Sequence, residues 1–237
     1  MSEAASAPTR TVPQGSPAKA AAPQKESALE GACGGRPYHH GDLSRALVMA
    51  GRRLLEAEGP TALSLRAVAR EAGVSPAAPY HHFKDKSELL DAVAKEGWRE
   101  LGVAIGKGRG GAANPKMAMI EIGVAYVSFA RQNPALYRLM YHAAYDREMM
   151  PDHAKDEDSG WRHVAEAIVE AGADPNEEQD MALAQIAAWC NVHGVAEMAG
   201  FKEFGPLKEA LGGEEPFVRA LLSHVGIFTR RPKTPHE

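Results

Sequence analysis

The stretch AVAREAGVSPAAPYHHFKDK, residues 67–86, decides the fold of this chain. It has the pattern of two short helices joined by Gly73-Val74-Ser75. In this pattern Gly73 supplies the left-handed residue that ends the first helix, Val74 fills the angle between the helices, and Ser75 caps the second. The spacing is typical of a helix-turn-helix unit with a core over residues 64–83, although a purely structural hairpin of two helices has the same spacing.

The second helix of this pair is unusual because it contains a proline and no lysine or arginine before Lys84. Pro79 would be its fourth residue, where the missing N–H removes only the first intrahelical hydrogen bond. We therefore expect a tight or partly 3₁₀ first turn, with the Pro79 ring packed inward beside Phe83. The outward face would then carry Pro76, Ala77, Tyr80 and His81.

From Tyr38 onward the apolar residues recur with helical spacing, and almost no segment alternates like a strand. The sequence therefore predicts an all-α protein. The expected helices run from an Asp42 cap to Gly59, from a Ser64 cap to Gly73, onward from Ser75, from about 85 to about 105, and over roughly 115–132, 134–143, 156–172, 175–200 and 214–229.

Changes in composition divide the chain into parts. Residues 1–37 are rich in Ala, Pro, Gly and Ser, with one leucine and no aromatic residue, so we expect a disordered tail. A small helical domain over 38–105 would be separated by the glycine-rich run 106–114 from a larger helical domain over 115–229. Residues 230–237 would form a flexible tail.

Overall composition excludes several classes of protein. The net charge of −4 gives no general sign of a nucleic-acid binder, so any basic patch must be local. No stretch approaches the roughly 18 apolar residues of a membrane span, and the N-terminus lacks the apolar core of a signal peptide. The two cysteines, Cys33 and Cys190, make a structural disulfide improbable. We expect a cytoplasmic protein without a membrane partner.

The residues that follow the turn closely resemble the TetR family of bacterial transcriptional regulators. That family joins its recognition helix to the next helix through the pattern A-G-V-S-x-x-x-x-Y-x-H-F-x-x-K-x-x-L. The matching positions here are Ala72, Gly73, Val74, Ser75, Tyr80, His82, Phe83, Lys86 and Leu89. The resemblance covers residues 40–95 and implies a three-helix helix-turn-helix DNA-binding domain followed by a helical effector-binding and dimerisation domain.

Two later segments are similar to parts of the same family. Trp189, His193 and Gly194 resemble the Trp-His-Gly signature of one subgroup's C-terminal domain, and residues 129–140 resemble a helix-to-helix corner common in the family. The resemblance implies a regulator of bacterial genes rather than an enzyme, without a cofactor or metal. It favours a dimeric repressor that leaves its operator DNA when a small molecule binds.

The resemblance also implies which residues face DNA. Arg66 would reach a guanine, Ala77 and Ala78 would pack on base edges, and neighbouring groups would hold phosphates. Arg70 would lie over the backbone, pair with Glu71 or face solvent, and Lys86 would neutralise a phosphate at a helix N-terminus. The expected DNA-contacting set is Ser64, Arg66, Arg70, Ser75, Pro76, Ala77, Ala78, Tyr80, His81, His82, Lys84 and Lys86.

The larger domain would hold an effector pocket and the dimer interface. An apolar or aromatic effector would contact Trp98, Met117, Ile120, Tyr126, Phe129, Met140, Tyr141, Trp189 and His193, although such residues also form ordinary cores. His193 could donate to this ligand, but the favoured prediction for it is a buried hydrogen bond to a carbonyl. The homodimer would form through the last two long helices, with apolar faces at Met181, Ile186 and Ala187 and at Phe217, Leu221, Leu222 and Val225.

Two other classes of protein remain as alternatives. A sequence-nonspecific architectural DNA-binding protein would need a more basic DNA face, since residues 38–95 contain eight Lys or Arg and seven Asp or Glu. An all-helical enzyme or metal-binding protein is less favoured, because the possible ligands straddle a loop and lack a ligand motif with regular spacing. Those possible ligands are His142, His153, His163, Asp146, Asp152 and Asp156.

Overall fold

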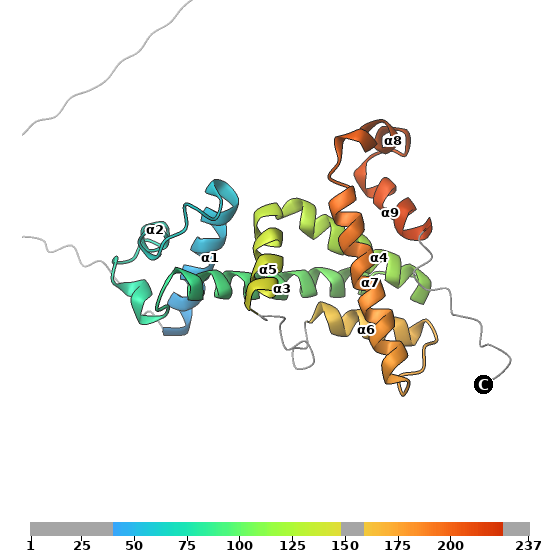
Figure 1. Cartoon of the computed structure of the whole chain (residues 1–237), viewed down its shortest axis with the longest axis horizontal. Coiled ribbons are helices and arrows are strands. Elements are labelled where there is room, and N and C mark those ends of the chain that lie inside the picture. Colours follow the sequence, from blue (N-terminus) through green and yellow to red (C-terminus); the bar gives the residue numbers. More distant parts are fainter. Residues whose placement is uncertain (1–39, 148–158, 225–237) are drawn as a thin grey trace, which may run out of the picture. The chain divides into compact units, whose positions relative to one another are not determined.

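Helices account for the secondary structure of the described part of this protein (Figure 1). The computed structural model describes residues 40–147 and 159–224, with side chains over 43–141 and 159–224. These residues belong to one compact unit and contain no strand, which confirms the all-α fold class. The tails predicted over 1–37 and 230–237, and Cys33, lie outside the described residues.

The first two helices follow the sequence pattern closely. Helix α1 (His40–Glu58) ends at Gly59, and α2 (Leu65–Glu71) begins after Ser64, whose Oγ accepts a hydrogen bond from the N–H of Ala67 at 3.1 Å. Because α1 begins at His40, Asp42 lies in its first turn and does not precede the helix. Gly73 has a φ of 70°, as the predicted left-handed end of α2 requires.

The 3₁₀ winding predicted at the start of the third helix is confirmed, but the α-helix predicted to continue from it is wrong. Only the 3₁₀ turn η1 (Ala78–His81) forms there, and the residue before it is Ala77 rather than a capping Ser75. The N–H groups of Ala78, Tyr80 and His82 each bond the carbonyl three residues earlier. Pro79 lacks the N–H that would bond the Ser75 carbonyl in an α-helix. That carbonyl instead accepts the N–H of Ala78 at 3.0 Å, as in the tighter 3₁₀ winding.

Helix α3 (Lys86–Gly110) is longer than predicted and includes the first five residues of the glycine-rich run. These glycines allow neighbouring helices to approach closely. A Cβ atom at Gly108 would lie 2.8 Å from the carbonyl oxygen of Glu121, and one at Gly106 would lie 2.6 Å from Nε2 of His163. Five of the nine residues expected to separate two domains therefore belong to a packed helix.

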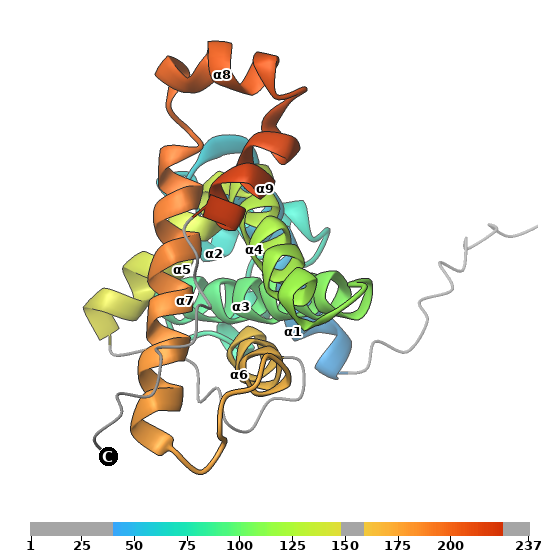
Figure 2. The ribbon, with the colours of Figure 1, turned by 90° about the vertical axis from the view of Figure 1, so that its right-hand side faces the viewer.

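The remaining helices form a bundle that has α3 and α4 at its centre (Figure 2). They are α4 (Pro115–Gln132), α5 (Pro134–Arg147), α6 (Gly160–Glu170), α7 (Glu178–Met198) and α9 (Glu214–His224). Helix α4 packs against α3, α6, α7 and α9. The sequence did not predict the short elements η2 (Lys202–Phe204) and α8 (Gly205–Ala210). Within the described ranges, no helix combines the length and apolar character needed to cross a membrane.

Candidate functional site

The outward side of η1 presents the residues predicted for it. Pro76, Ala77, Tyr80 and His81 are all exposed, and the Tyr80 side chain is 54% exposed. Pro79 is buried beside this surface, and Phe83 is also buried, with its N–H bonded to the Pro79 carbonyl at 2.9 Å. The inward position of Pro79 confirms the predicted division of this segment into an inner and an outer face.

Helix α2 adds two arginines to the exposed surface. Arg66 and Arg70 lie one turn apart, and neither forms an ion pair with another described residue. The pairing proposed for Arg70 with Glu71 is absent from the described residues, because Glu71 accepts a 2.8 Å hydrogen bond from Nε of Arg53 on α1. Arg70 therefore keeps its donors available to an outside partner.

Other predicted DNA contacts have local partners or are partly covered. The ammonium group of Lys86 donates to the carbonyl of Pro60 at 2.8 Å, which ties the start of α3 to the loop between α1 and α2. Lys84 is exposed, and its backbone N–H donates to Glu88 at 2.7 Å. Ala78 and His82 are half-buried, whereas Ser64 and Ser75 are exposed.

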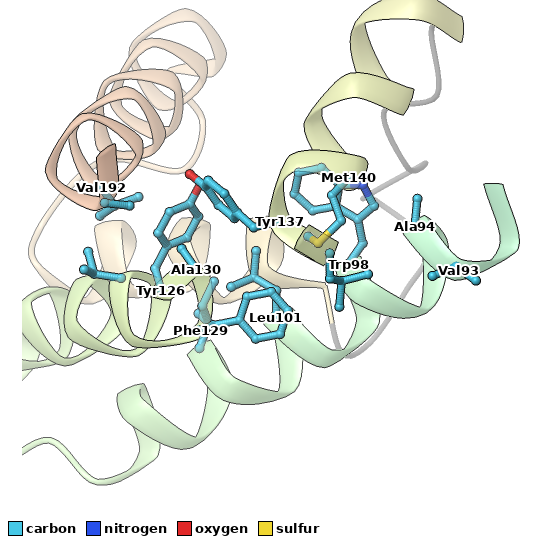
Figure 3. Packing of buried hydrophobic residues seen from close by; sticks show 14 of the residues in the cluster. Val93, Ala94, Trp98, Leu101, Tyr126, Phe129, Ala130, Tyr137, Met140 and Val192 are labelled. Carbon is cyan, nitrogen blue, oxygen red and sulfur yellow. The ribbon is translucent and has the colours of Figure 1, made fainter. Parts of the chain in front are cut away.

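A second candidate site lies in the bundle, where rings from five helices meet. Trp98 of α3 lies 5.3 Å from Tyr141 and 6.0 Å from Trp189, and Tyr126 of α4 lies 5.4 Å from Trp189. Figure 3 shows Tyr126 and Tyr137 meeting near their hydroxyl ends, and Trp98 beside Met140. We call the following set the aromatic cluster: Trp98, Tyr126, Tyr137, Tyr141, Trp161, Trp189 and His193.

Hydrogen bonds connect the polar atoms of the aromatic cluster. Nε1 of Trp189 donates to the Tyr141 hydroxyl at 2.7 Å, and the Tyr126 hydroxyl bonds those of Tyr141 and Tyr137. Nδ1 of His193 pairs with the Tyr137 hydroxyl, so the favoured prediction of a carbonyl partner for this histidine is wrong. Burial raises the pKa of the Tyr126 and Tyr137 hydroxyls far above their usual range, which keeps both groups protonated.

The cavity beside this cluster is small. Its volume is about 10 Å³, on the scale of one water molecule. Of the nine predicted effector contacts, Tyr126 and Trp189 line it. Trp98, Tyr141 and His193 belong to the aromatic cluster, whereas Phe129 and Met140 are buried in the core and Met117 and Ile120 are half-buried outside the cavity lining. The residues that line the cavity are Ile105, Met119, Ile122, Tyr126, Val164, Ala188, Trp189 and Val192.

Helix α7 has an apolar face that the described part of the chain leaves uncovered. Residues 181–196 contain no Asp, Glu, Lys or Arg. Leu183 is 64% exposed and Ile186 is 50% exposed. We call the following set the α7 face: Leu183, Ile186, Ala187, Cys190, Gly194 and Met198, all of which are exposed. An exposed apolar stripe of this kind is typical of an interaction surface.

The predicted role of the last helix requires a correction. Phe217 and Leu222 of α9 are buried inside the chain, and Leu222 packs so closely on α4 that a Cβ at Gly123 would lie 2.7 Å from its Cδ1. These side chains are core, and Val225 lies outside the described residues. In the described part of the chain, the uncovered half of the predicted interface is therefore on α7.

No metal centre is evident in the described residues. Groups of three or more His, Cys, Asp or Glu side chains placed for a metal ion do not occur there. Of the six metal-ligand candidates, only His163 has a described side chain, and it packs against Gly106.

Two family models match the chain, one over the part that carries α2 and η1 and one over most of the helical bundle. The model of the bacterial regulatory proteins of the tetR family matches residues 47–93, and that of the tetracyclin repressor-like C-terminal domain matches residues 119–223. The chain belongs to the TetR family of bacterial regulatory proteins. Members of this family are regulators, which agrees with the prediction that this protein is not an enzyme.

Individual relatives agree with the family. The chain is 30% identical to the HTH-type transcriptional regulator BetI of Brucella anthropi over 107 residues, which cover 44% of this chain and 55% of that protein. It is 31% identical over 110 residues to an HTH-type transcriptional regulator of Mycobacterium tuberculosis, with 43% and 47% covered. The chain thus spans about half the length of the curated relatives it matches.

Solved structures cover more of the chain. A protein of unknown function from Rhodococcus sp. RHA1 is 30% identical, and the match covers 81% of this chain and 97% of that one with a TM-score of 0.60. A TetR transcriptional regulator from Streptomyces coelicolor has a TM-score of 0.58 at 19% identity, with 77% of this chain and 96% of that chain covered. The second likeness is one of fold alone.

Proposed function

We propose that this TetR-family protein is a cytoplasmic, sequence-specific DNA-binding transcriptional regulator. The observation that carries the proposal is the surface formed by α2 and η1, where Arg66, Arg70, Tyr80 and His81 are exposed together with apolar Ala77. Arginine can bond a guanine edge bidentately, and small apolar groups can pack on thymine methyl groups. Tyrosine and histidine donors suit phosphate oxygens.

Phosphate binding in this proposal depends on few cations. Lys84 and Lys86 are the lysines next to η1, and the Pro60 carbonyl holds the Lys86 ammonium group at the edge of the same surface. A single copy therefore neutralises few phosphates, and affinity for operator DNA requires two copies on two half-sites.

The α7 face supplies the surface for that second copy. Two α7 helices can approach closely along Ala187, Cys190 and Gly194, because the first two have small side chains and glycine has none. The larger Leu183, Ile186 and Met198 flank this strip. Helix α9 would support α7 from behind through its packing on α4 and α7. We therefore assign the homodimer interface mainly to α7, and α9 contributes through its remaining surface.

The aromatic cluster is the proposed effector site. It brings together the Trp-His-Gly motif of α7 and rings of four other helices, which supports the proposal that the chain belongs to the subgroup with that signature. Since the present cavity has room for about one water molecule, an apolar or aromatic effector must displace rings to enter. Its binding would then favour a conformer whose two DNA surfaces no longer match the half-sites, as in a repressor released by its ligand.

In this proposal residues 38–105 bind DNA, and residues 115–229 bind the effector and dimerise. The two parts share α3 as a continuous helix. The proposed regulator needs no metal or cofactor for either role.

A footprint of the purified protein on the DNA that flanks its own gene tests the proposal. We expect a protected palindrome whose affinity exceeds that of random DNA and falls steeply as salt rises. Equal affinity for all sequences would instead identify an architectural DNA-binding protein. Repeating the footprint with uncharged aromatic metabolites tests the effector, and loss of protection with one of them would support a ligand-released repressor.

A further inference from the structure

At the corner between α4 and α5, the side chain of Asn133 bonds the preceding helix rather than the helix that it begins. Asn133 directly precedes α5, and its carbonyl accepts the N–H of Tyr137 at 2.8 Å, as an N-cap residue does. An N-cap side chain normally accepts an N–H from the first turn of its own helix. Here Nδ2 of Asn133 instead donates to the Phe129 carbonyl at 2.9 Å, which closes the end of α4.

A residue from the DNA-binding part provides the missing cap. Pro134 has no N–H, so the free donors in the first turn of α5 are those of Ala135 and Leu136. The Glu56 carboxylate of α1 accepts both, at 3.4 Å from Ala135 N and 2.9 Å from Leu136 N. Its negative charge also suits the positive N-terminal end of the helix.

Arg52, one turn before Glu56 on α1, makes a second tie to the same corner. Its Nη2 donates to Oδ1 of Asn133 at 2.8 Å and lies 2.7 Å from the Glu100 carboxylate of α3. One face of α1 is therefore attached to both α5 and α3 by charged hydrogen bonds.

The same α5 helix carries two rings of the aromatic cluster. Tyr137 is adjacent to the amide that Glu56 holds, and Tyr141 lies one turn further along. The adjacent residues Leu136 and Met140 fit tightly on α3, because a Cβ at Gly97 would lie 2.7 Å from Sδ of Met140 and 3.0 Å from Cδ1 of Leu136. A displacement of the two tyrosines would therefore move the corner that Glu56 and Arg52 hold.

We infer that Glu56 and Arg52 are the positioning residues through which the state of the aromatic cluster reaches the DNA-binding helices. This inference rests on the proposed function for its biological meaning, but the coupling itself is a property of the free protein. Because coupling between two sites is reciprocal, a change at the cluster must alter the stability of α1 and α2, and DNA on α2 must alter α5.

Hydrogen exchange of the free protein tests the coupling without DNA or effector. Tyr137→Phe removes the hydroxyl that bonds Tyr126 and His193, and we expect it to change the exchange protection of amides in residues 43–71 by about 5-fold or more. In a protein that already carries Glu56→Ala, adding Tyr137→Phe should leave the exchange protection of residues 43–71 unchanged. A Glu58→Ala background is the matched control, since Glu58 is exposed on the same helix, and it should keep the change.

Equal responses in the Glu56→Ala and Glu58→Ala backgrounds would overturn the inference, and so would no response in residues 43–71 of the parent protein. If Glu56→Ala proves too unstable, two milder variants replace it. Glu56→Gln retains one accepting oxygen, and Arg52→Lys retains the positive charge. Each should reduce, without abolishing, the change in exchange protection that Tyr137→Phe causes. Operator binding is measured separately by footprinting. Loss of operator binding with intact coupling would count against the proposed function and leave this inference standing.

Discussion

Arg66 is the single residue on which sequence discrimination depends most in the proposed complex. Its guanidinium is exposed and has no ion-pair partner among the described residues, so no internal interaction is lost when it is removed. We expect Arg66→Ala to weaken specific operator binding by about 1–3 kcal/mol and to relax specificity at one base pair, as fluorescence anisotropy on operator variants would show. Arg138→Ala, which removes an exposed arginine of α5, is the control for net charge, and equal losses in both variants would refute the role of Arg66.

Single residues differ in how far the sequence could predict their surroundings. The inward position of Pro79 follows from its spacing to Phe83, because both lie within one local turn. The partners of Glu56 could not be predicted, since they lie 79 and 80 residues away along the chain. No periodicity connects such positions, and the free N–H groups of α5 would have been assigned to Asn133 as the nearest cap.

Helix α3 contains glycines that have a low helix propensity but that allow α4 and α6 to pack closely against it. We expect Gly108→Ala to lower the free energy of unfolding by about 1–3 kcal/mol, because the new methyl group would lie 2.8 Å from the Glu121 carbonyl. Gly110→Ala is the matched control, since no atom lies within 4 Å of the added Cβ, and it should be neutral or stabilise by up to about 1 kcal/mol. Urea unfolding of both variants measures the difference, and a stabilising Gly108→Ala would contradict the close packing of α3 on α4.

The sequence predicts the bounds of a helix well where clear start and end signals flank it. Helices such as α4 have a clear Asn114-Pro115 start and a clear Asn133-Pro134 end, and their bounds were predicted correctly. The end of α3 was predicted too early because helix propensity penalises glycine, whereas close packing of α4 and α6 requires it. The six-residue α8 is too short to show a helical period at all.

The stability of the whole molecule should depend on pH in the alkaline range. The folded-state pKa values of Tyr126 and Tyr137 are raised, chiefly by burial, so their contribution is complete below the unfolded value of about 10 and is lost as pH rises above it. Each group should lower the free energy of unfolding by about 1.4 kcal/mol per pH unit there. In an alkaline titration, circular dichroism and tyrosinate absorbance should report unfolding together, and Tyr126→Phe should make the loss of stability shallower. Ionisation of these two tyrosines while the helices remain intact would disagree with their burial.

The assembly of two molecules can be tested at the α7 face. Ile186→Asp places a charge at the centre of this apolar surface, where a second copy would have to bury it without a partner. We expect light scattering to give twice the 25.4 kDa chain mass for the parent protein and the mass of one chain for the variant. Ala171→Asp adds the same charge at the exposed end of α6 and should leave the dimer intact. A dimer that survives Ile186→Asp would place the interface elsewhere.

The composition of the aromatic cluster has an optical consequence. All three tryptophans of the sequence, Trp98, Trp161 and Trp189, belong to it, and each has another ring centre within 6.0 Å. The indole emission of this protein therefore originates from one place, and the DNA-facing surface contributes none. A compound that separates these rings changes the emission spectrum directly, so the unlabelled protein can serve as its own sensor in a search for the effector.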